Sequence, residues 1–266
     1  DVRCSFFKLT SRMKQIKRRL DLVLVDRGLA TSRQRARALI LAGKILVNKL
    51  PAAKAGTLIS EADSIELKGA DIPYVSRGGL KLEGALNEFS LKISGCICLD
   101  VGASTGGFTD CLLQHGAERV YAVDVGYGQM AWKLRQDPRV VAIERTNIRH
   151  MPVEMIPEAI DIATIDASFI SLKIVVPAVT PFMKEDGFIL ALIKPQFEVG
   201  KDQVGKGGVV RDSRLHTRVI EDMSSFFTET GFGCENVVPS PLLGPKGNRE
   251  FFILLQHNDT GKKNSS

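Results

Sequence analysis

From residue 96 onward the chain alternates short apolar runs with longer amphipathic segments. This alternation limits the fold more than any other feature, because successive parallel strands need a crossover between them, usually a helix. We expect strands at Cys96–Asp100, Val120–Val125, Val140–Glu144, Ile160–Asp166, Phe188–Ile193, Glu235–Pro239 and Glu250–Leu255. We expect helices at Leu80–Phe89, Gly107–His115, Gln129–Arg135, Leu172–Met183 and Ser213–Thr230. The order predicts an α/β fold, a mostly parallel sheet with helices on both faces.

Ligands of such sheets bind at the carboxyl ends of the strands, so we expect the binding residues in the turns that follow the strands. The first turn, Asp100–Phe108, reads DVGASTGGF and brings a strand into a helix through three glycines. Its spacing is G-x-x-x-G-G, whereas a dinucleotide fingerprint reads G-x-G-x-x-G. The acid before the first glycine, Asp100, suits an amino group better than it suits a pyrophosphate.

Two further polar residues follow neighbouring strands. Asp124 ends the second strand, where it is placed to accept hydrogen bonds from two ribose hydroxyls, and Asn147 follows the third, where it is placed to meet an adenine edge. Together with the glycine turn they resemble the S-adenosylmethionine site of Rossmann-type methyltransferases. The resemblance implies S-adenosylmethionine as cofactor and the following binding residues: Asp100, Gly102, Ser104, Thr105, Gly106, Gly107, Phe108, Asp124 and Asn147.

Four charged residues stand at the borders of apolar strands, where an unused charge is costly to bury. Asp166 ends the fourth strand, Lys194 ends the fifth, Glu250 opens the last, and Lys81 lies in SRGGLKL before the first. The set resembles the Lys-Asp-Lys-Glu catalytic tetrad of the FtsJ-like ribose 2′-O-methyltransferases. A ribose hydroxyl is a weak nucleophile that needs positioning and a base. We expect Lys194 to act as the base, Asp166 to orient it, and the other two residues to position the substrate.

The first quarter of the chain differs from the remainder in charge. Residues 1–68 hold 15 basic and 6 acidic residues, whereas the remainder holds 21 basic and 24 acidic residues. Such an excess of cations on one module is typical of a polyanion-binding surface, although a solubilising surface also explains it. The pattern predicts helices at Arg19–Gly28 and Arg33–Ala42, capped by Thr31 or Ser32, and strands at Lys44–Asn48 and Ser64–Leu67.

The segment Ser32–Asn48, SRQRARALILAGKILVN, resembles the S4 RNA-binding domain. S4 domains bind structured RNA through its backbone and shape, so the resemblance implies RNA contacts by Arg18, Arg19, Arg33, Arg37 and Lys44. For each of these cations taken alone, a solvated side chain is the alternative. We therefore expect an S4-like domain at residues 17–74 and a methyltransferase domain at 75–256. The flanks, 1–16 and 257–266, are expected to be disordered, and Met13 is a candidate start.

The combination of an S4-like module with SRGGLKL, DVGASTGGFTD, TIDASFISL, IKPQFE and GPKGNREFF resembles the TlyA-type family, often labelled hemolysin A. This resemblance runs from Lys17 to Leu255. It implies S-adenosylmethionine-dependent ribose 2′-O-methylation of ribosomal RNA, with cytidine as the target. Ribosomal RNA or ribosomal subunits are then the partners, and no membrane or metal partner is expected.

Two other functions remain open from the residues alone. A non-catalytic RNA-binding factor for ribosome assembly predicts a broken tetrad or lost cofactor glycines, and both are intact here. A cytolytic hemolysin predicts a secretion signal and a long apolar or amphipathic segment, and neither is visible. The five cysteines lack paired C-x-x-C spacing, so we expect neither disulfides nor a zinc site, and a cytoplasmic setting fits. The glycine-rich segment Pro195–Asp212 is interpreted as either a mobile lid or a passive surface loop.

Overall fold

The computed structural model describes residues 17–30, 32–68 and 72–257, and it divides into two compact units, 1–71 and 72–266. The predicted extension 1–16, the cap candidate Thr31 and residues 258–266 of the predicted tail lie outside the described residues. The predicted domain borders stay predictions.

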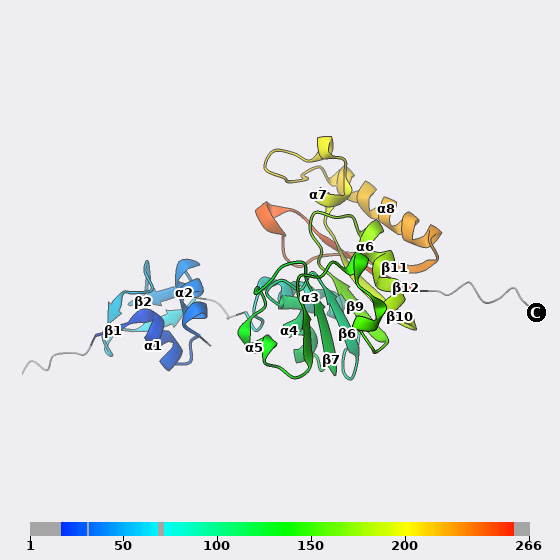
Figure 1. Ribbon diagram of the computed structural model, residues 1–266. Helices are drawn as coiled ribbons and strands as arrows, with labels where there is room; N and C mark the ends of the chain where they lie inside the picture. Colours follow the sequence, from blue (N-terminus) through cyan, green and yellow to red (C-terminus); the bar gives the residue numbers. More distant parts are fainter. Residues whose placement is uncertain (1–16, 31, 69–71, 258–266) are drawn as a thin grey trace, which may run out of the picture. The chain divides into compact units, whose positions relative to one another are not determined.

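The N-terminal unit combines two short helices with small antiparallel sheets (Figure 1). Its elements are β1 (Arg18–Arg19), α1 (Leu20–Asp26), α2 (Arg33–Leu41), β2 (Ile45–Val47), β3 (Leu50–Pro51), β4 (Leu58–Ile59) and β5 (Ile65–Leu67). Strand β2 pairs with β3 and β5, and β1 pairs with β4, all antiparallel. The sequence did not predict β1, β3 or β4, because a strand of two residues is too short to show a period of two.

A single apolar cluster holds the N-terminal unit together. Helix α2 begins at a Ser32 cap, whose hydroxyl accepts a hydrogen bond from the Arg35 backbone N–H at 3.1 Å. Its stripe of Ala36, Leu39 and Ile40 packs with residues of α1, β2 and β4. The exposed face of α2 carries the basic residues, as expected from helical spacing.

The C-terminal unit is built on a seven-stranded sheet in the order β11-β12-β10-β9-β6-β7-β8 (Figure 1). The strands are β6 (Ile97–Val101), β7 (Arg119–Val123), β8 (Val140–Ile143), β9 (Ile160–Ile165), β10 (Met183–Ile193), β11 (Phe232–Pro239) and β12 (Phe251–His257). Five strands from β10 to β8 are parallel, whereas β12 is antiparallel to β10 and β11. The predicted mostly parallel α/β fold is confirmed.

Helices cover both faces of this sheet, and each face has its own apolar core. The helices are α3 (Arg77–Glu88), α4 (Gly107–Gln114), α5 (Trp132–Arg135), α6 (Leu172–Val179), α7 (Pro195–Glu198) and α8 (Ser213–Glu229), with short 3₁₀ turns η1 (Ile148–His150), η2 (Val153–Met155), η3 (Thr180–Phe182), η4 (Lys201–Gln203) and η5 (Pro245–Gly247). One core joins the sheet to α3, α4 and α5, and the other joins it to α6 and α8. Along β6, Cys98 enters the first core and Leu99 the second, as strand alternation requires.

Two predicted helices end differently in the structure. The helix expected at Leu172–Met183 stops at Val179, because Pro181 occupies the start of η3 and Met183 already belongs to β10. The helix expected from Gln129 begins only at Trp132 and has four residues. Strand β10 is correspondingly longer than predicted, since its polar first half, Met183–Asp186, carries no apolar period.

Candidate active site

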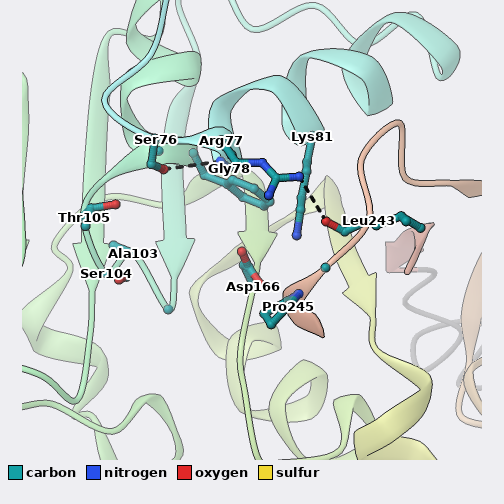
Figure 2. Close-up of a pocket in the computed structure, with 14 residues that line it drawn as sticks. Ser76, Arg77, Gly78, Lys81, Ala103, Ser104, Thr105, Asp166, Leu243 and Pro245 are labelled. Carbon is teal, nitrogen blue, oxygen red and sulfur yellow. Dashed lines mark hydrogen bonds between the residues drawn. The ribbon is translucent and has the colours of Figure 1, made fainter. Parts of the chain in front are cut away.

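A cavity of about 270 Å³ opens at the carboxyl ends of β6 and β9. Figure 2 shows Lys81 reaching toward it from α3 and Asp166 from the end of β9, with Leu243 and Pro245 along another edge. It is lined by residues of α3, the glycine turn, the end of β9 and the segment before β12: Ser76, Arg77, Gly78, Lys81, Gly102, Ala103, Ser104, Thr105, Gly107, Phe108, Asp166, Leu243, Gly244 and Pro245. The predicted glycine turn and two of the four predicted catalytic residues therefore share one cavity.

The glycine turn is close-packed at the positions where it bends. Gly102 has φ +84°, and a Cβ there would lie 2.7 Å from the Asp166 carbonyl oxygen. A Cβ at Gly107 would lie 2.2 Å from the Ser76 hydroxyl oxygen. Any side chain at either position would displace a neighbour, so the sequence needs glycine there. The bare backbone that results faces the cavity.

The nine residues predicted to bind the cofactor divide into two groups. Gly102, Ser104, Thr105, Gly107 and Phe108 line the cavity. The other four, Asp100, Gly106, Asp124 and Asn147, do not line it. Gly106 has φ +89° and caps the start of α4.

Asp124 and Asn147 are bonded to backbone near the carboxyl ends of β7 and β8. The Asp124 carboxylate accepts hydrogen bonds from the Ser104 N–H at 2.7 Å and the Gly126 N–H at 2.6 Å. The Asn147 side chain is exposed and accepts from the Arg149 N–H at 3.1 Å, which caps η1. Both contacts are structural, and a partly exposed carboxylate such as Asp124 still has lone pairs for a ligand.

Asp100 lies elsewhere than its sequence position suggested. The sequence predicted direct contact with an amino group, whereas the structure buries this carboxyl completely beneath the turn. The Thr109 N–H and hydroxyl donate to its Oδ2 at 2.9 and 2.6 Å, and the Thr164 hydroxyl donates to its Oδ1 at 3.3 Å. Burial raises the pKa of Asp100 to about 7, and the nearby Asp166 carboxylate adds to the rise. These contacts tie the glycine turn to the start of α4.

Lys81 and Glu250 form a buried ion pair between segments 169 residues apart. The Lys81 Nζ lies 2.5 Å from the Glu250 Oε2, and the two side chains are 10 % and 0 % exposed. The Glu250 Oε1 is buried without a hydrogen-bond partner among the described residues. Gly244 packs so closely on this carboxylate that a Cβ there would lie 1.9 Å from Oε1. Glu250 precedes β12 and does not open the strand as predicted.

Lys194 and Asp166 form a second ion pair at the ends of two adjacent strands. The Lys194 Nζ lies 2.5 Å from the Asp166 Oδ1 and donates to the Ser168 hydroxyl oxygen at 2.9 Å. The Lys194 side chain is 8 % exposed and the Asp166 side chain 25 % exposed. Because Lys81 and Asp166 line the same cavity, the two pairs meet there.

The antiparallel direction of β12 explains how Glu250 reaches the carboxyl ends of the parallel strands. In the β10–β12 register Ile193 lies opposite Phe251, so the next position, Lys194, lies opposite Glu250. A parallel last strand would have placed its first residue at the opposite edge of the sheet. Sequence reasoning missed Ser168 and the capping residue Ser76, although both lie inside motifs already singled out, TIDASFISL and SRGGLKL.

The five cations predicted to contact RNA lie in the N-terminal unit, and three of them have carboxylate partners. Arg18 pairs with Asp26. Arg19 and Arg33 both bind the buried Asp21, at 2.9 and 3.2 Å, and these hydrogen bonds lower the pKa of Asp21 to about 2. Arg37 is exposed and Lys44 is half-buried. The three paired arginine side chains remain about half exposed, and the RNA contacts of all five cations stay predictions.

Within residues 17–30, 32–68 and 72–257, no cluster of three or more His, Cys, Asp or Glu side chains has the geometry of a metal site. Across the same part of the chain, no helix has the length and apolar character needed to cross a membrane.

Comparisons with known proteins match both units. The FtsJ-like methyltransferase model matches residues 74–257, and the S4 domain model matches 18–65. The 16S/23S rRNA (cytidine-2′-O)-methyltransferase TlyA of Mycobacterium tuberculosis is 49 % identical over 239 residues, 90 % of this chain and 89 % of that protein. Hemolysin A of Brachyspira hyodysenteriae is 43 % identical over 234 residues, 88 % of this chain and 97 % of that protein.

A solved structure from Streptococcus thermophilus that also carries the name hemolysin has a TM-score of 0.72 and 43 % identity. It covers 91 % of this chain, which covers 89 % of it. The family match, the relatives and the cavity agree with one another. The chain belongs to the FtsJ-like methyltransferase family and carries an S4 domain ahead of its methyltransferase domain.

Proposed function

We propose that this protein transfers the methyl group of S-adenosylmethionine to the 2′-hydroxyl of a cytidine in ribosomal RNA. The observation that carries the proposal is the shared cavity, where a glycine turn meets a buried and a partly exposed Lys–carboxylate pair. The name of the M. tuberculosis relative supplies the substrate class and the nucleoside. A ribosomal substrate would place the protein in the cytoplasm.

The residues of the cavity fit the proposed cofactor. Gly102 and Gly107 line the cavity with bare backbone, and Ser104 and Thr105 offer polar groups beside it. We assign the cofactor to this turn, with Phe108 at its base and with Asp124 on its ribose. When bound, S-adenosylmethionine supplies a methyl group on a sulfonium sulfur, which leaves as a neutral thioether.

The four charged residues then have distinct tasks. Lys194 would act in its neutral amine form and accept the proton of the 2′-hydroxyl, and Asp166 and Ser168 would hold its nitrogen in place. Asp166 is partly hydrated, so its field on Lys194 is screened more than the field of the buried Glu250 on Lys81. Lys81, fixed by Glu250, is therefore assigned to hold the substrate oxygen. General-base catalysis is typically worth about 10²–10⁴-fold in rate.

An exposed aromatic side chain beside the catalytic pair supports a nucleotide substrate. Phe169 is 90 % exposed, has φ +63°, and its ring centroid lies 4.9 Å from that of Phe197. A bulky residue rarely adopts a positive φ, and such strain persists where the surrounding structure holds it. Exposed aromatic rings are common stacking partners for unpaired RNA bases.

The experiment that tests this function is methyl transfer from tritium-labelled S-adenosylmethionine to purified rRNA and to ribosomal subunits. We expect label in RNA, located in a dinucleotide that resists alkaline cleavage, because a 2′-O-methyl group blocks attack on the next phosphodiester. Label recovered in mononucleotides, the products of complete alkaline cleavage, would contradict ribose methylation. Absence of label with both substrates would favour the non-catalytic RNA-binding function.

A further inference from the structure

Two neighbouring segments carry exposed cations, and one of them borders the active-site cavity. The first is the glycine-rich loop 205–211, with Lys206 and Arg211, and the second is the turn 244–249, with Lys246 and Arg249. All four side chains are exposed. Among the residues that the structure describes, no carboxylate forms an ion pair with any of them. We call these four cations and their two segments the loop–turn surface.

Outside these two segments several cations of the same unit pair with carboxylates, whereas Lys92, Arg145, Arg149 and Lys173 form no such ion pair among the described residues. Arg119 pairs with Glu158, Lys133 with Asp110, Arg135 with Glu144, Arg139 with Asp137 and Lys184 with Asp161. The turn 244–249 contains two basic residues and no acidic residue. The unit as a whole has a small net charge, and the four cations of the loop–turn surface add unpaired positive charge near the cavity.

A buried asparagine joins the two segments into one body. Asn248 is 3 % exposed, and its Oδ1 accepts from the Val210 N–H at 3.1 Å. Its Nδ2 donates to the Gly208 carbonyl at 3.0 Å and to the Pro245 carbonyl at 3.2 Å. The His216 ring nitrogen Nε2 also lies 3.0 Å from the Val210 carbonyl, which anchors the loop to α8. Two side-chain hydrogen bonds of this buried residue join the loop to the turn, and the third closes the turn itself.

The loop–turn surface borders the site of the proposed reaction. Gly244 and Pro245 line the cavity, and Glu250, the partner of Lys81, directly follows Arg249. Arg77 donates a hydrogen bond to the carbonyl of Leu243, the residue before this turn, at 3.4 Å and ties it to α3 (Figure 2). An RNA strand whose ribose enters this cavity must lay its neighbouring phosphates along the rim.

We propose that Lys206, Arg211, Lys246 and Arg249 form a phosphate-binding surface that holds the RNA backbone beside the target ribose. The inference rests on the proposed function and deepens it, because it separates backbone binding by the catalytic unit from RNA binding by the S4 domain. Unpaired cations on a surface held by Asn248 are matched to phosphates, which position RNA without reading its sequence. The glycines of the loop let its backbone approach the strand closely.

The test compares single variants of the full-length protein in binding to purified rRNA over a series of salt concentrations. Each phosphate contact contributes about 0.7–0.9 to the slope of log affinity against log salt. We expect Lys246→Ala and Arg249→Ala each to reduce that slope by this amount and to weaken binding about three- to tenfold at moderate salt. The matched control is Lys92→Ala, which removes an exposed lysine from the segment that precedes β6. It should leave both the slope and the affinity unchanged.

The outcomes separate this inference from the proposed function. Wild-type protein that neither binds nor methylates rRNA refutes the function and the surface with it. If the wild-type protein methylates rRNA but the variants show the wild-type salt slope, the phosphate-binding surface is refuted and the proposed function is not. An equal loss of slope in the Lys92 control would show that only net charge matters, which also overturns the assignment. The affinity for S-adenosylmethionine, measured by calorimetry without RNA, should be the same in the wild-type protein and in the three variants.

Discussion

The buried Lys81–Glu250 pair gives the sharpest prediction about stability. Neither side chain has a second charged partner among the described residues, and the pair joins α3 to the segment before β12. Replacing one member leaves the other charge buried and uncompensated. Glu250→Gln keeps the shape of the side chain, so its effect isolates the loss of charge.

The magnitude follows from the burial. Breaking a buried ion pair by removal of one partner typically costs about 3–5 kcal/mol, because the remaining charge keeps its desolvation penalty. For a unit of this size 1 kcal/mol shifts the melting temperature by about 2–4 °C, so each single variant, Glu250→Gln or Lys81→Met, should lower it by about 6–20 °C. The double variant removes both charges and should recover most of that loss.

Unfolding in urea measures the free energies of unfolding on which this prediction rests. The one tryptophan of the chain, Trp132, lies in the C-terminal unit, so its fluorescence reports that unit. Both single variants should unfold at lower urea than wild type, and the double variant should lie between them and wild type. A single variant as stable as wild type, or a double variant that is less stable than both singles, would refute the reasoning. All three should lose methyl transfer.

Three further changes test other parts of the structure. Between about pH 4 and 7 folded Asp100 holds a proton that the unfolded chain releases, so stability should fall as pH rises through this window, and Asp100→Asn should abolish that dependence in urea titrations. The pKa of Asp21 is lowered, so its stabilisation of the N-terminal unit is present above about pH 4 and is lost as pH falls toward 2. Asp21→Asn should therefore remove the fall in stability of this unit between about pH 4 and 2, which circular dichroism can follow. Gly102→Ala should destabilise the protein by about 1–3 kcal/mol and weaken donor binding in calorimetry, because its Cβ would collide with the Asp166 carbonyl; unchanged donor affinity would contradict the role of the turn.

Sequence periodicity predicted the larger elements because apolar spacing and strand-end turns are local signals. The regions of β8 and α8 were expected almost as the structure has them. The direction of β12 was not expected, because an apolar run reads the same in both orientations. The end of α6 was placed too far along the chain, although Pro181 was visible, since apolar residues continue beyond it.

The candidate site was predicted by resemblance better than by residue chemistry. Only the resemblance to the family tetrad predicted that Lys81 and Glu250 share a site, because no local signal links positions 169 residues apart. Asp100 was given a ligand contact from its place before a glycine, whereas burial and the hydrogen bonds from Thr109 turn it toward the protein interior. Side-chain direction at the end of a strand depends on three-dimensional packing, which the sequence does not display.

The central claim is that the two ion pairs at the cavity carry out methyl transfer, with Lys194 as the base. The most direct measurement is the single-turnover rate of Lys194→Ala with saturating labelled donor and rRNA, beside donor affinity from calorimetry. We predict a fall of about 10²–10⁴-fold in rate with donor affinity unchanged. A wild-type rate in this variant would contradict the claim.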